Sequence, residues 1–176
     1  MIKSEGPVKQ ATKGAALAFH WTYIILPVVI LVLSLILAAS FYNRLPVVLA
    51  YHFESDGSPD KWLSREVFML WMLLPQLLLT LLAWGLTWGV TKLSGLFRQM
   101  EGVLIQPERI LLFMGNMVAM PQVVLCFAML DIFVYNSFHV HIMPVWVFAL
   151  IIMGLGGIVI GVIFIRAMRR VLGARG

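Results

Sequence analysis

The chain contains a single cysteine, Cys126, and lacks the sequence motifs by which common catalytic and zinc sites are recognised. One cysteine cannot form an intrachain disulfide, so cysteine usage gives no information about the redox compartment. The sequence has no Gly-x-Ser-x-Gly nucleophile elbow, no phosphate-binding glycine loop, no cysteine pair and no His-x-x-x-His spacing. No catalytic residue is therefore predicted, and a non-enzymatic protein is favoured.

Polar stretches long enough to form a separate soluble domain are also missing. Hydrophobic residues make up 61% of the chain and the mean hydropathy is +0.96, whereas soluble domains use roughly 45–50% apolar residues. The apolar residues form four runs, at 21–41, 67–90, 110–135 and 145–165. A helix of about 20 residues crosses the hydrocarbon core, and only helices satisfy their own backbone there.

The composition and the four runs together predict an all-α integral membrane protein with four transmembrane helices. The membrane domain is expected at 19–170, between terminal tails at 1–18 and 171–176. A structured outer loop is expected at 42–66, between the first two helices. Cys126 lies inside the third expected helix.

The basic residues predict the orientation of these helices. Ten of them fall on one side of a four-helix arrangement: Lys3, Lys9, Lys13, Lys92, Arg98, Arg109, Arg166, Arg169, Arg170 and Arg175. Arg44, Lys61 and Arg65 fall on the other side. Because the cytoplasmic side carries the excess of Lys and Arg, both termini are expected in the cytoplasm. The basic residues follow membrane ends and form no face with interleaved aromatics, which favours anionic lipids over nucleic acid as partners.

Two Pro-Gln pairs, Pro75-Gln76 and Pro121-Gln122, lie near the middle of the second and third apolar runs. Proline removes a helical hydrogen bond, and a neighbouring amide can satisfy the freed carbonyl. One interpretation is a pair of broken helices lining a transport pathway, with Asp131 as its acidic residue. The alternative is a pair of structural kinks in which the glutamines bond to neighbouring helices.

Glycine pairs at helical spacing occur in two of the apolar runs. Gly85-x-x-x-Gly89 lies in the second run and Gly157-x-x-x-Gly161 in the fourth. Small residues four apart let helix backbones approach closely. We expect these faces to pack within one molecule, and a homo-oligomer is the alternative.

Three histidines and one acid gather at the expected outer ends of the helices. His139 and His141 are separated by one residue, so an extended segment would point both imidazoles to one face. With His52 from the outer loop and Asp131 from the third apolar run, they form a conceivable divalent-metal site. The competing interpretation is a polar loop whose histidines serve only the membrane interface.

The outer loop carries the most specific sequence pattern in the chain. Its residues are Leu45-Pro46, His52-Phe53, Gly57-x-Pro59-Asp60-x-Trp62 and Ser64-Arg65, followed directly by a long apolar run. This pattern resembles a family of bacterial integral membrane proteins whose signature domain has no assigned function and which includes the SdpI-type immunity and signalling proteins. Ala50 stands where that family usually has a second proline, and Glu54 replaces a common asparagine.

The resemblance implies a bacterial inner-membrane protein in which the outer loop forms the binding surface. The residues it implies for that surface are His52, Gly57, Pro59, Asp60 and Trp62. Gly57 permits a positive φ in a turn, and His52 is expected to pair with Asp60 across it. The favoured function is a non-enzymatic accessory, sensor or immunity-type protein that recognises a peptide or another membrane protein.

Two other functions remain open from the sequence. The first is a small oligomeric transporter or channel component that uses Gln76, Gln122 and Asp131 along its pathway. The second is a metal-dependent membrane enzyme built on His52, Asp131, His139 and His141. No organic cofactor is predicted, and no ligand is identified.

Overall fold

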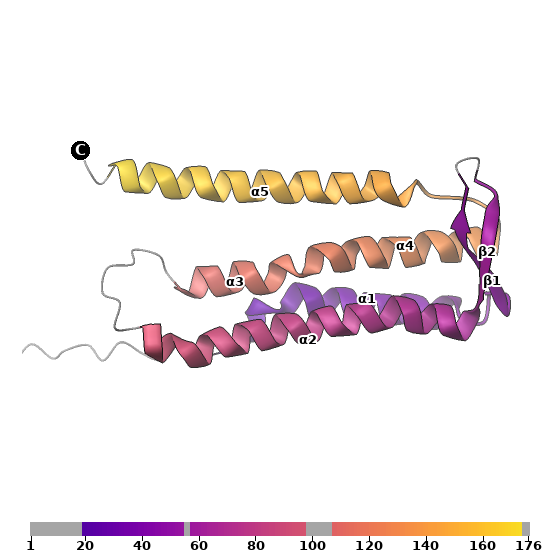
Figure 1. The fold of residues 1–176 in the computed structure, drawn as a ribbon, viewed down its shortest axis with the longest axis horizontal. Helices are drawn as coiled ribbons and strands as arrows, with labels where there is room; N and C mark the ends of the chain where they lie inside the picture. Colours follow the sequence, from indigo (N-terminus) through magenta and orange to yellow (C-terminus); the bar gives the residue numbers. More distant parts are fainter. Residues whose placement is uncertain (1–18, 55–56, 98–106, 174–176) are drawn as a thin grey trace, which may run out of the picture.

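A computed structural model describes residues 19–54, 57–97 and 107–173 as a bundle of long helices with a β-hairpin across one end (Figure 1). The elements, in chain order, are η1 (Trp21–Tyr23), α1 (Ile25–Phe41), β1 (Val48–Phe53), β2 (Pro59–Ser64), α2 (Arg65–Phe97), α3 (Pro107–Met117), α4 (Ala119–Phe138) and α5 (Val145–Gly173). The predicted tail at 1–18, residues 174–176 of the predicted C-terminal tail, and residues 98–106 between the second and third apolar runs lie outside the described residues.

Three segments are long and apolar enough to cross a membrane: Arg65–Leu93, Leu111–Phe138 and Val145–Arg166. They indicate a multi-pass membrane protein. The first predicted run is shorter as a helix, because η1 and a non-helical Ile24 precede the 17 residues of α1. At 1.5 Å per residue α1 is about 25 Å long, against a hydrocarbon core of about 30 Å. Four complete spans are thus not established by helix length.

Proline divides the third predicted run. Pro121 is the third residue of α4, where a missing N–H costs no helical hydrogen bond, but it cannot bond back to the carbonyl of Met117. Helix α3 accordingly ends at Met117, and α4 begins after Val118. Pro75, by contrast, lies inside an uninterrupted α2.

A buried polar cluster joins α1, α2 and α4 beside the two prolines. Ser34 donates to the Gln76 side-chain oxygen, and Gln122 Nε2 donates to the Gln76 carbonyl at 2.9 Å and to Thr80 Oγ1 at 2.8 Å. Gln76 and Gln122 are both fully buried. The expected hydrogen bonds between glutamines and neighbouring helices are therefore present. Membrane hydrogen bonds of this kind contribute on average about 0.6 kcal/mol each.

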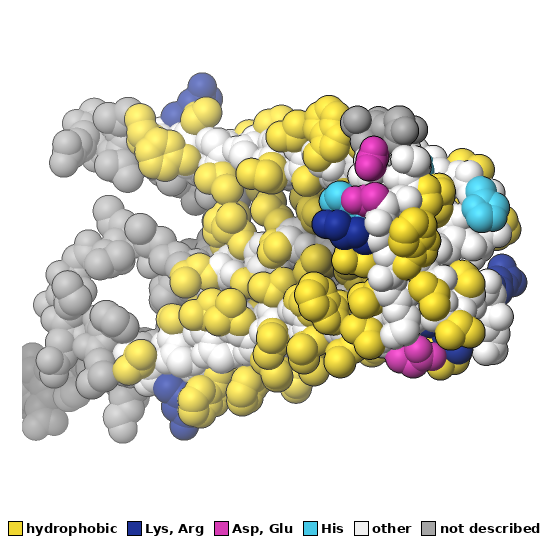
Figure 2. Space-filling model, turned by 45° about the vertical axis from the view of Figure 1, so that its right-hand side comes forward, with side chains coloured by type: hydrophobic (Ala, Val, Ile, Leu, Met, Phe, Trp, Pro, Cys, Tyr) yellow, Lys and Arg dark blue, Asp and Glu magenta, His cyan; other side chains and the backbone are white. Residues whose placement is uncertain are grey.

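The elements from η1 to α4 pack around two apolar clusters, one toward each end of the bundle. The cluster beneath the hairpin is centred on Leu49, Phe68, Met129 and Phe133. The cluster at the opposite end contains Tyr23, Ile24, Ala83 and Leu111. Figure 2 shows hydrophobic side chains over the flank of the bundle, with charged side chains toward its ends. This distribution is the one expected for a protein surrounded by lipid.

The glycines that permit close packing are not the ones predicted. A Cβ added at Gly85, Gly89, Gly157 or Gly161 would meet no heavy atom within 4 Å, so the expectation that these pairs pack within one molecule is wrong. A Cβ at Gly115 would lie 2.1 Å from the Tyr23 carbonyl oxygen. Close contacts occur instead at Gly115 and at Gly156, where an added Cβ would meet the Met120 side chain, and the described surface over both glycine pairs is open.

Candidate functional site

The outer loop predicted to form the site folds as a two-stranded antiparallel hairpin. Val48 pairs with Ser64, Leu49 with Leu63 and Ala50 with Trp62, and the register shifts before His52 pairs with Lys61. Gly57 has φ +85° in the connecting turn, which confirms the predicted positive φ. The sequence did not predict the strands themselves. Val48 to Phe53 contains the β-branched and aromatic residues that favour strands, but it is only six residues long.

Asn136 near the end of α4 fastens the hairpin to the bundle. Its Oδ1 accepts from the Ala50 N–H at 2.9 Å, and its Nδ2 donates to the Ala50 carbonyl at 2.8 Å. Nδ2 also donates to the Ile132 carbonyl one turn earlier, which fixes the amide in place. The side chain therefore satisfies both peptide groups of Ala50, as a neighbouring strand would.

Arg65 fastens the other side of the hairpin at the start of α2. Its guanidinium lies 4.0 Å from the centre of the Tyr42 ring and donates to the Tyr42 carbonyl at 2.9 Å. Neither Arg65 nor Asn136 was predicted as a site residue. Arg65 belongs to the outer-loop pattern, which is a usable signal, whereas Asn136 is 86 residues from Ala50 and has none.

Aromatic rings fill the space between the hairpin and the end of α4. Phe53 lies edge-on to Tyr135 and to His141, with ring centres 4.4 and 4.5 Å apart. Tyr135 and His141 stack with their centres 4.6 Å apart. The hairpin is therefore held at its tip by packing as well as at Ala50 by hydrogen bonds, and it forms a fixed cap.

Only two of the four predicted metal ligands, Asp131 and His141, come together. Buried Asp131 accepts from the Ile142 N–H at 2.7 Å and contacts His141 Nδ1 at 2.9 Å. His139 ends α4 in the left-handed conformation, φ 57°, so the extended His139-x-His141 segment is also wrong. His52 contacts Asp60 instead. Within residues 19–54, 57–97 and 107–173, no three His, Cys, Asp or Glu side chains are grouped to hold a metal ion.

The three predicted pathway residues, Gln76, Gln122 and Asp131, lie in two different parts of the bundle. Gln76 and Gln122 share the buried cluster between α1, α2 and α4, whereas Asp131 holds the loop before α5. A cavity found in the bundle is lined by none of the three. The two glutamines therefore hold three helices together, while Asp131 stabilises the loop at the outer end of the bundle.

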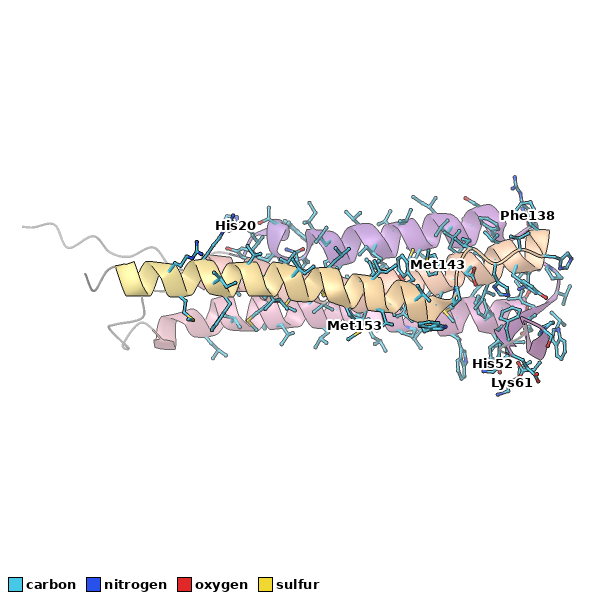
Figure 3. All side chains as sticks on the ribbon, turned by 90° about the horizontal axis from the view of Figure 1, so that it is seen from above. His20, His52, Lys61, Phe138, Met143 and Met153 are labelled. Atoms are coloured by element: carbon cyan, nitrogen blue, oxygen red, sulfur yellow. The ribbon has the colours of Figure 1, made fainter. Side chains whose placement is uncertain are left out.

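His52 and Asp60 pair across the hairpin as predicted. His52 Nδ1 lies 2.6 Å from Asp60 Oδ1. This hydrogen bond, aided by the positive charges of His52 and Lys61, holds the pKa of Asp60 below its ordinary value of 3.8. Figure 3 shows His52 and Lys61 at the same end of the bundle as Phe138, with His20 at the opposite end.

Removal of His52 is expected to raise the pKa of Asp60 toward 3.8. A carboxyl whose folded pKa is lowered stabilises the fold above its unfolded pKa, and this contribution is lost as the pH falls through the folded value. The pair should therefore persist between pH 7 and about 4. Carbon-13 carboxyl titration of wild type and His52→Gln tests this, with exposed His20→Gln as the control. An unchanged Asp60 titration in His52→Gln would contradict the assignment.

Five residues of the hairpin that are exposed or partly exposed, Val48, His52, Asp60, Lys61 and Trp62, form what we call the hairpin face. Leu49 on the opposite side is fully buried, whereas Val48 is 54% and Trp62 56% exposed. An apolar centre is thus bordered by an ion pair and a lysine. Of the five predicted binding residues, His52, Asp60 and Trp62 lie on this face, while Gly57 and Pro59 shape the turn that leads to it.

Comparison with known proteins assigns a family description to this part of the chain. The family profile described as a domain of unknown function (DUF1648) matches residues 29–75, which run from α1 through the hairpin into α2. This is about a quarter of the chain, and it confirms the predicted similarity to an uncharacterised domain family for that segment. No curated protein and no solved structure matches the chain.

Proposed function

We propose that this protein is a non-enzymatic accessory of a bacterial inner membrane, of the sensor or immunity type, which recognises an extended segment of a peptide or another membrane protein. In this proposal α1, α2, α3 with α4, and α5 form four spans, and both termini are cytoplasmic. The unequal distribution of basic residues supports that orientation. The free edge of β2 at Trp62 is the observation that supports the recognition mode.

The strand register identifies which backbone groups of β2 point outward. The Arg65 N–H donates to the Val47 carbonyl at 2.9 Å, which makes Val47 and Arg65 a hydrogen-bonded pair. Such pairs alternate along an antiparallel ladder, so Ala50 and Trp62 form a non-hydrogen-bonded pair whose N–H and C=O groups point away from each other. The contact of both Ala50 groups with Asn136 agrees with this alternation.

The two edges of the hairpin therefore differ in whether their outward backbone groups are hydrogen-bonded. Asn136 covers the β1 edge, while at the β2 edge no described side chain or helix backbone is hydrogen-bonded to Trp62. A free N–H and C=O on a strand edge can form hydrogen bonds with an added extended segment. The neighbouring side chains then determine which segment binds. Trp62 supplies a large apolar contact, and Lys61 and Asp60 supply charges beside it.

The proposal also includes a functional relationship between this hairpin and the SdpI-type proteins that the outer-loop pattern resembles. The matched segment, 29–75, contains the whole hairpin together with most of α1 and the first third of α2. A recognition surface carried by this segment would be common to proteins that differ in their remaining spans. We therefore assign the hairpin face as the part that this chain shares functionally with immunity and signalling proteins of that type.

The β2 edge is tested by photocrosslinking in living cells. A benzoylphenylalanine at Lys61 should capture a defined protein or peptide segment, with the captured residues mapped by mass spectrometry. Trp62→Pro removes the outward N–H and no bond of the ladder to β1, so capture should fall at least about tenfold, which corresponds to about 1.4 kcal/mol. Trp71→Ala, at an exposed position on α2, is the matched control. Crosslinks to lipid alone, or capture insensitive to Trp62→Pro, would overturn the proposal.

A further inference from the structure

An apolar groove of about 870 Å³ lies between α1, α3, α4 and α5, away from the hairpin. Among the residues that line it are Thr22, Leu26, Leu112, Asn116, Val123 and Ile152. Leu26 is 50% and Leu112 45% exposed, so the groove is open along its side. In a membrane-embedded bundle this opening faces the lipid.

The amide of Asn116 in the groove is already hydrogen-bonded within the protein and needs no polar ligand. Asn116 donates to the Thr22 carbonyl at 3.0 Å and to the Leu112 carbonyl at 2.9 Å, and it accepts from the Leu26 N–H at 3.0 Å. Its amide is fully used in capping the start of α1 from a neighbouring helix. The remaining lining is mostly aliphatic and methionine, which suits a hydrocarbon chain.

The groove has the length of one membrane leaflet. Leu112 and Val123 mark its two ends along α3 and α4, and eleven residues at 1.5 Å each extend about 16 Å. Half of a hydrocarbon core is about 15 Å. A chain that enters beside Thr22 and Leu112 would therefore reach the middle of the bilayer at Val123 and Ile152.

Two arginines of α5 stand near the interfacial end of the groove. Gly156 of α5 is level with Met120, since a Cβ at Gly156 would meet the Met120 side chain. Helix α5 runs antiparallel to α3 and α4 (Figure 1). Arg166 is ten residues after Gly156, so it lies about level with the residue ten positions before Met120, residue 110. Arg166 and Arg169 are exposed and, within the described chain, form no ion pair with an acidic side chain.

We propose that this groove binds one acyl chain of an anionic phospholipid whose headgroup contacts Arg166 and Arg169. The aliphatic lining accepts the chain, the leaflet length matches it, and the two free cations stand where the phosphate of a leaflet lipid lies. Basic residues at the membrane surface attract anionic headgroups. This site is independent of the hairpin face, so either proposal can fail without the other.

Native mass spectrometry of the full chain, supplied with equimolar phosphatidylglycerol and phosphatidylcholine, tests the site. One phosphatidylglycerol per chain should survive activation that removes phosphatidylcholine. Val123→Trp fills the deep end of the groove and should reduce retention at least tenfold, whereas Leu82→Trp, at an exposed position of α2, should not. Arg166→Gln with Arg169→Gln should abolish the preference for phosphatidylglycerol. Equal retention of both lipids by wild type, or unchanged retention in Val123→Trp, would overturn the proposal.

Photolabelling provides a second measurement that needs no substitution. Phosphatidylglycerol carrying a diazirine on its acyl chain is incorporated with wild-type protein into phosphatidylcholine vesicles and irradiated. Adducts should concentrate on residues 25–30 and 112–123, which form two walls of the groove. Adducts distributed equally over the exposed face of α2, including Leu78 and Leu82, would show an annular lipid and refute a specific site.

Discussion

Replacing Asn136 with leucine is expected to detach the hairpin from the bundle while the helices remain folded. The substitution removes the two hydrogen bonds to Ala50 and the anchoring bond to the Ile132 carbonyl. It leaves the Ala50 N–H and C=O without partners at a partly buried position. A buried polar group left unsatisfied costs about 1–3 kcal/mol, so the two groups together should weaken docking by about 2–6 kcal/mol.

Hydrogen exchange measures this effect at the group concerned. The Ala50 amide should exchange about two orders of magnitude faster in Asn136→Leu, because each 1.4 kcal/mol changes an opening equilibrium tenfold. Amides in the middle of α2 should exchange as in wild type. If the hairpin face recognises an extended segment, photocrosslinking from Lys61 should fall in parallel, since the edge would no longer be presented in a fixed position.

Asn43→Leu is the matched control for Asn136→Leu. Asn43 lies at the same end of the molecule, is exposed, and makes no hydrogen bond with its side chain in the described structure. The same change of amide to isobutyl group should therefore leave the exchange of Ala50 unaltered. Equal acceleration by both substitutions would indicate a general loosening of the outer end, and no acceleration by Asn136→Leu would refute the role of the amide.

The helices were predictable because lipid imposes a strong and local requirement on sequence. Any run of about 20 apolar residues satisfies it, so the runs beginning at 67 and 145 matched α2 and α5 closely at their outer ends. The first run was less accurate, because an apolar run does not reveal that Ile24 leaves the helical conformation. The break after Met117 had a signal in Pro121, which marked the position correctly.

The hairpin was only partly predictable because its contacts join distant residues. The turn at Gly57 and the pairing of His52 with Asp60 depend on residues within eight positions, and both were anticipated. The contact between Ala50 and Asn136 crosses 86 residues. The proposed metal site failed for a related reason, since the left-handed His139 turns the chain before His141. Neither the contact between Ala50 and Asn136 nor the left-handed conformation of His139 produces a repeating pattern in the sequence.

Gly115→Ala is expected to destabilise the bundle by about 3 kcal/mol, at the upper end of the usual cost of overpacking. The added Cβ would lie 2.1 Å from the Tyr23 carbonyl oxygen and 2.7 Å from Thr87 Cγ2. A backbone oxygen cannot rotate away as a side chain can, so α3 would have to move from η1 as a whole. That movement would also lengthen the neighbouring Asn116 bonds to Thr22 and Leu26. Unfolding in mixed micelles with rising SDS content measures the loss.

Gly85→Ala makes the identical chemical change where no atom lies within 4 Å of the new Cβ, and it should leave the unfolding free energy unchanged or raise it by up to about 1 kcal/mol. The comparison separates close packing from helix propensity, because alanine favours a helix at both positions. It also shows whether the effect depends on the glycine-pair motif or on the close contact, since Gly85 belongs to a glycine pair and Gly115 does not. Equal destabilisation by the two substitutions would show that the face over Gly85 is covered in the assembled protein, and a neutral Gly115→Ala would refute the close approach of α3 to η1.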